Sequence, residues 1–315
     1  MTTVGRLNWM SGVDNGTKLH KLSILGTHES CALYGGGPTQ CQSKSITELL
    51  EAGVRFLDVR CVHAHGTWDF PVFHGSVYQE THFADVERAC RDFLHAHPSE
   101  TILMNLQQEI NNGLVNRTGE EFLERFLDLY DPSVWVFPNS SPKLEDCRGK
   151  IVLVRAYDPA SKAGWPSTYP SVGKALPGGG GLEWNGFHTD GTSYNTLFET
   201  QNGWEIYGKG RSFDAANAVK EGKVEEYLKL AAAGKVSPNR FYINFLSRAA
   251  GAYVGTAAEK INGATRQFLR NHLADYSQRL GIVPIDFVGN TSVPNCLEDL
   301  VLRHNPYIAA VRFQY

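Results

Sequence analysis

Short, almost continuously apolar runs, each about the length of a β-strand, recur along this chain with amphipathic segments between several of them. Runs of this kind are typical of strands that are buried on both faces of a parallel sheet. The amphipathic segments predict helices that cover such a sheet, and the alternation of the two predicts an α/β protein. The predicted strands are residues 22–25, 54–62, 72–73, 101–106, 151–154, 241–246 and 282–287, and the predicted helices are residues 83–97, 122–130, 215–233 and 257–280.

The length of the chain, 315 residues, fits one large domain. No linker rich in Pro, Gly and Ser divides it, and residues 158–181, which end in four consecutive glycines, are predicted to form a long loop at a functional rim. A (β/α) barrel of eight strands typically takes roughly 250 residues. We therefore predict a single barrel domain over residues 1–315.

The composition excludes several classes of protein. Charged residues make up 20% of the chain and hydrophobic residues 42%, which is unlike a disordered protein. The 30 basic and 33 acidic residues give a formal charge of −3, without the basic excess of a nucleic-acid-binding protein. No apolar run approaches the roughly 18 residues of a membrane-spanning helix. The N-terminal residues lack the pattern of a secretory signal peptide, so the compartment stays open between the cytoplasm and secretion.

The cysteines do not form an obvious framework, because six are too few for a disulfide scaffold of this size. Cys31 and Cys41 flank a glycine-rich loop, and the sequence leaves it open whether they are joined. Cys61, His63 and His65 would share one face of a strand, as metal ligands can. Structural roles are favoured for them, because no fourth ligand is evident.

Polar side chains stand at the carboxyl ends of several predicted strands. His28 and His74 each follow an apolar run, and Asp286 lies in the last one. Asp58 and Arg60 occupy alternate positions of one strand, so both face the same side. Because barrel enzymes carry their active sites where the strands end, we expect these side chains to converge. A further strand ends in Asn105, Gln107 and Gln108.

This set of residue types suits acid–base cleavage of a phosphodiester without a metal. Two imidazoles can serve as general base and general acid, and a carboxylate behind one of them would orient it. An arginine between them suits a phosphate. The alternative is that each histidine is structural and that Asp58 and Arg60 form only a buried ion pair.

Four segments, SILGTHES, GVRFLDVR, VFHGS and SETILMNLQQE, follow one another over about residues 20–110. In this order they resemble the X domain of phosphatidylinositol-specific phospholipase C, in particular the small single-domain enzymes of bacteria and some fungi. A weaker similarity continues through KIVLVRAY, RFYINFL and GIVPIDF. The resemblance implies an irregular, incompletely closed TIM barrel. It also implies cleavage of phosphatidylinositol, or of a glycosylated form, to diacylglycerol and inositol 1,2-cyclic phosphate.

The resemblance also assigns roles to the residues at the strand ends. His28 matches the general base, which takes the proton from the inositol 2-hydroxyl, and Asp286 matches the carboxylate that orients it. Arg60 matches the group that stabilises charge on the phosphate. His74 matches the general acid that protonates the departing diacylglycerol oxygen. Asp58 matches an acidic residue that holds Arg60 or a histidine in place, and Glu29 stands where the bacterial enzymes carry Asp.

The same alignment predicts catalysis without a metal or other cofactor. Calcium-dependent members of the family carry a ligand carboxylate at the position of Arg60, and Gln107 replaces another. Ca²⁺ needs about 6 to 8 oxygen ligands, and an arginine places a fixed cation among them. For the inositol ring, the nearest matches to the family's binding groups are Gln107, Arg155 or Tyr157, Asn202 and Trp204.

The resemblance implies a lipid substrate, and with it transient contact with a membrane surface by a monomer that binds no nucleic acid. Exposed aromatic rings favour such contact. Packing over the barrel mouth is the alternative for each ring. The candidate rings are Tyr34, Trp165, Tyr169, Trp184 and Tyr253.

Two further functions remain open: a module that binds an inositol head group without cleaving it, and a metal-dependent phosphodiesterase of the glycerophosphodiester type.

Overall fold

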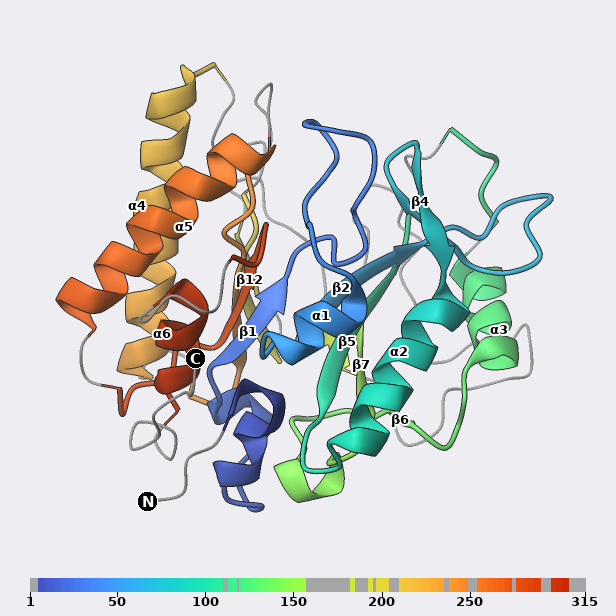
Figure 1. Ribbon diagram of the computed structural model, residues 1–315, viewed down its shortest axis with the longest axis horizontal. Helices are drawn as coiled ribbons and strands as arrows, with labels where there is room; N and C mark the ends of the chain where they lie inside the picture. The colour runs from blue at the N-terminus through green and yellow to red at the C-terminus, as the bar shows by residue number, and fades with distance from the viewer. Residues whose placement is uncertain are drawn as a thin grey trace.

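The computed structural model describes residues 5–109, 113–117, 119–156, 182–184, 192–194, 197–203, 210–234, 238–248, 254–273, 276–289 and 296–305. One curved sheet forms the centre of the molecule (Figure 1). Its strands are β1 (Ile24–Thr27), β2 (Phe56–Cys61), β3 (Pro71–His74), β4 (Val77–His82), β5 (Ile102–Gln108), β6 (Trp135–Val136), β7 (Ile151–Ala156), β8 (Leu182–Trp184), β9 (Thr192–Tyr194), β10 (Phe198–Gln201), β11 (Phe241–Asn244) and β12 (Ile282–Ile285).

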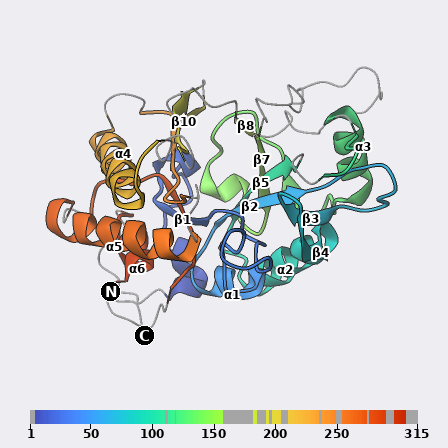
Figure 2. The same cartoon turned by 90° about the horizontal axis from the view of Figure 1, so that it is seen from above.

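The sheet runs in the order β6-β7-β5-β2-β1-β12-β11-β10-β9, and all neighbours are parallel except β9 and β10. The hairpin of β3 and β4 branches from β2, and β8 pairs with β7. Seen from above, the strands curve around a common centre with the helices outside them (Figure 2). Among the described residues no pairing joins β8 to β9. The barrel is therefore incompletely closed, which confirms the predicted fold class.

Helices cover the outer side of the sheet (Figure 1). In the described residues, Ser45 and Ser212 cap the starts of two of them. Ser45 accepts a hydrogen bond from the backbone of Glu48, whose carboxylate bonds back to the backbone of Ser45, and together they start the first helix. No helix in the described part of the chain is long and apolar enough to span a bilayer. The helices are α1 (Ile46–Glu51), α2 (Phe83–Ala96), α3 (Gly119–Leu129), α4 (Phe213–Ala233), α5 (Val254–His272) and α6 (Leu297–Arg303), and short 3₁₀ helices cover Arg6–Gly12, Leu19–Lys21 and Leu144–Asp146.

The centre of the sheet is packed so closely that one strand position requires glycine. Gly26 of β1 pairs with Phe56 of β2 on one side and Pro284 of β12 on the other. A Cβ atom at this position would lie 2.9 Å from Cδ1 of Phe56 and 3.3 Å from Cα of Pro284. Most buried apolar side chains of the sheet and its helices form one continuous core, and Ala32, Cys41 and Val254 form a small separate cluster. This packing fixes the relative heights of β1, β2 and β12, whose carboxyl ends carry the site.

Each predicted strand is present, with ends that shift by up to about two residues. The predicted helix over residues 257–280 is wrong at its end, because α5 stops at His272. The backbone N–H of Leu280 donates to Oγ of Ser23 at 2.7 Å instead of to a helical carbonyl. Gly281 then takes a φ of 75° and leads into β12. The short strands β4, β6, β8, β9 and β10 and the helices α1 and α6 were not predicted.

All six cysteines are free thiols, so Cys31 and Cys41 are not joined. The ring of His63 packs edge-on against Phe70, and this contact fits the structural role favoured for it. The predicted rim loop, residues 158–181, lies outside the described residues.

Candidate active site

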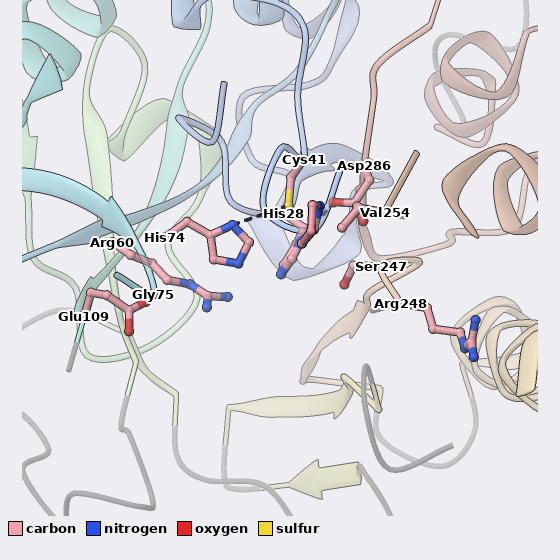
Figure 3. A pocket seen from close by; sticks show the side chains of 11 residues that line it. His28, Cys41, Arg60, His74, Gly75, Glu109, Ser247, Arg248, Val254 and Asp286 are labelled. Atoms are coloured by element: carbon pink, nitrogen blue, oxygen red, sulfur yellow. Dashed lines mark hydrogen bonds and ion pairs between the residues drawn. The ribbon is translucent and has the colours of Figure 1, made fainter. Parts of the chain in front are cut away.

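The carboxyl ends of β1, β2, β3 and β12 meet at one pocket (Figure 3). Its empty volume, open solvent included, is about 720 Å³. The predicted residues His28, Arg60, His74 and Asp286 all line it. The other described residues that line the pocket are Pro38, Cys41, Gly75, Glu109, Ser247, Arg248 and Val254.

His28 follows β1 directly and is held at both its backbone and its ring. Its N–H donates to the carbonyl of Ile285 at 3.2 Å, and its carbonyl accepts from Nε2 of Gln42 at 2.9 Å. Nδ1 of its ring lies 2.8 Å from Oδ1 of Asp286. If Nδ1 carries the proton of this hydrogen bond, Nε2 is left unprotonated and able to accept a proton.

Arg60 lies between two buried carboxyl groups. Its guanidinium is 2.9 Å from Oδ2 of Asp58 and 2.7 Å from Oε1 of Glu29. Asp58 also accepts from Nδ2 of Asn105 at 2.8 Å and from the backbone N–H of Glu29 at 3.2 Å. Glu29 reaches this position with an unusual φ of 44°. The ion pair of Asp58 and Arg60 is therefore present, and it lies inside the candidate site.

The pKa values of the two carboxyl groups shift in opposite directions. Burial acts to raise the pKa of Asp58, but the attraction of Arg60 and the hydrogen bonds it accepts outweigh this, and its pKa is lowered. Burial raises the pKa of Glu29 to about 8 against the attraction of Arg60. These directions favour an ionised Asp58 and a protonated Glu29 near neutral pH.

His74 ends β3 and faces His28 across the pocket (Figure 3). Its Nδ1 lies 2.6 Å from the carbonyl oxygen of Thr39, which can only accept, so Nδ1 carries a proton. Its Nε2 is 3.9 Å from Oε1 of Glu29. Burial, with a further contribution from Arg60, lowers the pKa of His74. Nε2 is therefore the atom through which His74 can pass a proton to a bound molecule.

The residues expected at the inositol ring are less clearly placed. Gln107 pairs with Arg60 in the sheet, Arg155 is buried in β7, and Asn202 is buried just after β10. The described pocket lining does not include these three side chains. Trp204 and Tyr157 lie outside the described residues.

Of the aromatic rings considered for membrane contact, Tyr34 is described and is 43% exposed. Trp165, Tyr169 and Tyr253 lie outside the described residues, as does the side chain of Trp184.

Sequence reasoning missed several lining residues. Ser247 and Arg248 come three and four positions after the end of β11, and Glu109 comes directly after β5. The rule that led to His28 and His74, polar residues at the carboxyl end of a strand, would have found these three as well. Cys41 was considered only as half of a disulfide bridge, and no local pattern places its sulfur in the pocket.

Residues 21–157 match the sequence profile of the family described as phosphatidylinositol-specific phospholipase C, X domain. This segment contains His28, Arg60 and His74 in the geometry given above. Residues 21–157 form an X domain of this family. Asp286 lies outside the X-domain match and joins the site through the sheet, because β12 pairs with β1.

Full-length comparisons extend the similarity beyond the X domain. The chain is 28% identical over 300 residues to the 1-phosphatidylinositol phosphodiesterase of Staphylococcus aureus strain Newman, covering 90% of this chain and 89% of that protein. It is 24% identical over 305 residues to the enzyme of the same name from Listeria monocytogenes, covering 92% and 84%.

Solved structures of phosphatidylinositol-specific phospholipase C share the fold. One from S. aureus gives a TM-score of 0.73 at 23% identity, over 96% of this chain and 98% of that one. The structure from L. monocytogenes gives 0.72 at 22% identity, over 96% and 99%. The barrel therefore continues beyond the X domain, through the strands that bring Asp286 to the pocket.

Proposed function

We propose that this protein is a phosphatidylinositol-specific phospholipase C that needs no metal. It cleaves phosphatidylinositol, or a glycosylated form, to diacylglycerol and inositol 1,2-cyclic phosphate. The observation that carries this proposal is the arrangement of the His28–Asp286 pair, Arg60 and His74 around one pocket. The names of the S. aureus and L. monocytogenes relatives support the same substrate.

In the first half of the reaction, Nε2 of His28 removes the proton from the 2-hydroxyl of the inositol ring. The oxygen attacks the neighbouring phosphorus and forms the five-membered cyclic phosphate. Because nucleophile and phosphorus belong to one molecule, much of the entropic cost of bringing them together is already met. Asp286 stabilises the imidazolium that forms on His28.

Arg60 stabilises the charge that develops on the non-bridging phosphate oxygens. Asp58 holds the guanidinium at 2.9 Å and supplies one counter-charge. A second ionised carboxylate would cancel the attraction of Arg60 for phosphate. The protonated state of Glu29 avoids this, and we assign Glu29 the role of keeping the site cationic enough to bind its substrate.

His74 completes the reaction by protonating the diacylglycerol oxygen as the bond from this oxygen to phosphorus breaks. Its Nδ1 is occupied by the carbonyl of Thr39, so the proton leaves from Nε2. Glu29 lies 3.9 Å from this nitrogen and holds a proton in the same pH range, which supports a role in supplying His74.

The independence from metal is proposed from the contacts of Arg60. Its guanidinium sits between Asp58 and Glu29, the carboxyl groups that a calcium ion would need. A hard cation with about 6 to 8 oxygen ligands does not fit beside a fixed positive charge. For the inositol ring we retain Gln107, Arg155 or Tyr157, Asn202 and Trp204 as candidates.

We also propose that one domain, residues 1–315, acts as a monomer that touches the membrane transiently. Tyr34 is 43% exposed, Trp68 87% and Val115 73%, and such side chains favour a lipid interface. Solved structures of the S. aureus enzyme address the modulation of its membrane binding.

The test is phosphorus NMR of the purified protein with phosphatidylinositol in detergent micelles and EDTA. We expect the resonance of a cyclic inositol phosphate to appear. A product that forms only after Ca²⁺ is added would overturn the independence from metal. Binding of the head group without any product, in EDTA or with Ca²⁺, would identify a binding module instead.

A further inference from the structure

A cysteine thiol stands beside the proposed general base. Cys41 is fully buried from solvent but lines the pocket, and its sulfur lies above the rings of His28 and His74 (Figure 3). One ligand atom each from His28, Cys41 and Asp286 lies within 4.8 Å of the others. We propose that these three side chains form an inhibitory site for Zn²⁺, which blocks the enzyme by capturing its base.

The separations are close to those that zinc requires. Zinc binds imidazole nitrogen at about 2.0 Å, thiolate sulfur at about 2.3 Å and carboxylate oxygen at about 2.1 Å in a tetrahedron. Ligand atoms in such a site are roughly 3.4–3.6 Å apart, by the geometry of a tetrahedron with those bond lengths. The pair His28–Asp286, at 2.8 Å, has to open slightly, and the widest separation, at most 4.8 Å, has to shorten.

The change has to come from side-chain rotation, because the backbone of two of the ligands is held in place. Gln42 donates to the carbonyls of both His28 and Ile285 at 2.9 Å. Nδ2 of Asn262 donates to the carbonyl of Asp286 at 2.9 Å. These bonds fix the strand ends from which two of the three ligands project. Outer contacts of this kind orient metal ligands in known sites.

The ligand types select the metal. One thiolate, one imidazole and one carboxylate suit Zn²⁺, whereas Ca²⁺ and Mg²⁺ prefer oxygen alone. Water takes the fourth coordination position of the zinc, because Nδ1 of His74 is hydrogen-bonded to the carbonyl of Thr39. Zinc binds Nδ1 of His28, and the proton that Nδ1 directs at Asp286 moves to Nε2. Binding also replaces the thiol proton of Cys41 by the metal and releases that proton to solvent.

Zinc at this position removes the catalytic base in two ways. It binds Nδ1 of His28 and leaves the ring proton on Nε2, which then cannot accept a proton from the substrate, and it draws away the carboxylate of Asp286 that orients the ring. The inhibition rests on the proposed function, whereas the binding of the metal does not. The two parts of the proposal can therefore fail separately.

Cobalt spectroscopy tests the binding. Co²⁺ is added to the metal-free protein, and a thiolate-to-cobalt charge-transfer absorption is expected in the wild type. It should persist in Cys31→Ser, a control that removes another buried thiol, and be absent from Cys41→Ser and Cys41→Ala. Circular dichroism of each variant confirms the fold. No charge-transfer band in the wild type, or a band that survives in a folded Cys41 variant, overturns the site.

Inhibition is measured with phosphatidylinositol micelles, relative to the metal-free activity of each variant. The Zn²⁺ concentration for half-inhibition should rise more than about 100-fold in Cys41→Ser, since even outer contacts of a metal site are worth roughly 10–100-fold. Equal inhibition of the wild type and Cys41→Ser would refute the inhibitory role. A cobalt band in a protein without activity in EDTA would leave the metal site intact and reject the proposed function.

Discussion

The carboxylate of Asp286 lies 2.8 Å from Nδ1 of His28, although 258 residues separate the two in the chain. The parallel pairing of β12 with β1 produces this contact, because it brings their carboxyl ends side by side. It is the relationship that fixes the ring orientation of a histidine at a strand end, as the proposed role of His28 as general base requires.

Replacing Asp286 with Asn should keep the fold but reverse the orientation of the hydrogen bond to His28. An amide that donates to Nδ1 favours the tautomer whose Nε2 already carries a proton. We expect kcat to fall by about 10²–10⁴-fold, the range for disabling a general base. The control is Asp69→Asn, since Asp69 pairs with His82 at 3.0 Å on the surface. Equal losses in both variants would show that Asp286 has no special role.

The protonation of Glu29 should appear in the pH dependence of activity. Burial raises its pKa to about 8, so the carboxyl ionises above that pH and places a second negative charge beside Arg60. We expect kcat/KM to fall as the pH rises through about 8. Glu29→Gln stays neutral and should lose this alkaline decline. An identical decline in Glu29→Gln would assign it to another group.

Lys220 should shape the stability of the protein at alkaline pH. Burial lowers its pKa from 10.5 to about 7, although Nζ donates to Gln201 at 2.8 Å. Between these pH values the unfolded chain binds a proton at Lys220 that the folded chain does not. The contribution of this residue to the free energy of unfolding therefore rises from pH 7 to 10.5.

Chemical denaturation at several pH values measures this effect. Lys220→Met carries no charge and should flatten the pH dependence of the free energy of unfolding between pH 7 and 10.5. Lys229→Met, on the exposed side of the same helix, should leave this pH dependence unchanged. If the free energy of unfolding depends on pH in Lys220→Met as it does in the wild type, the lysine remains charged in the folded state.

Gly26→Ala should destabilise the protein, because the new methyl group meets Phe56 and Pro284 at 2.9 and 3.3 Å. Overpacking of this kind costs about 1–3 kcal/mol of the free energy of unfolding. Gly263 lies in α5 with no atom within 4 Å of the same position, so Gly263→Ala should be neutral or stabilise by up to about 1 kcal/mol. Urea denaturation compares the two. Equal stabilities would contradict the close packing of β1.

The sequence allowed the central strands and the residues at their ends to be predicted for one physical reason. Parallel strands place their carboxyl ends on one edge, and alternation along β2 places Asp58 and Arg60 on one face. Residue type and position along a strand were therefore sufficient for His28, Arg60 and His74.

What could not be predicted depends on loops and on contacts between distant segments. Glu29 meets Arg60 because its backbone adopts a positive φ, and no local pattern signals this. The carbonyl of Thr39, 35 positions away in the chain, determines that Nδ1 of His74 carries a proton. Cys41 reaches the pocket on the same loop. Strands of two or three residues, such as β6 and β9, are too short to show a period.

The most direct test of the central claim, that His28 is the base and His74 the acid, varies the leaving group. His28→Ala and His74→Ala are each assayed with phosphatidylinositol and with a nitrophenyl ester of inositol phosphate, whose leaving group needs no proton. We predict that both variants lose nearly all activity on the lipid and that only His74→Ala recovers activity on the nitrophenyl ester. Equal losses of both variants on both substrates, or recovery of His28→Ala alone, would contradict the account.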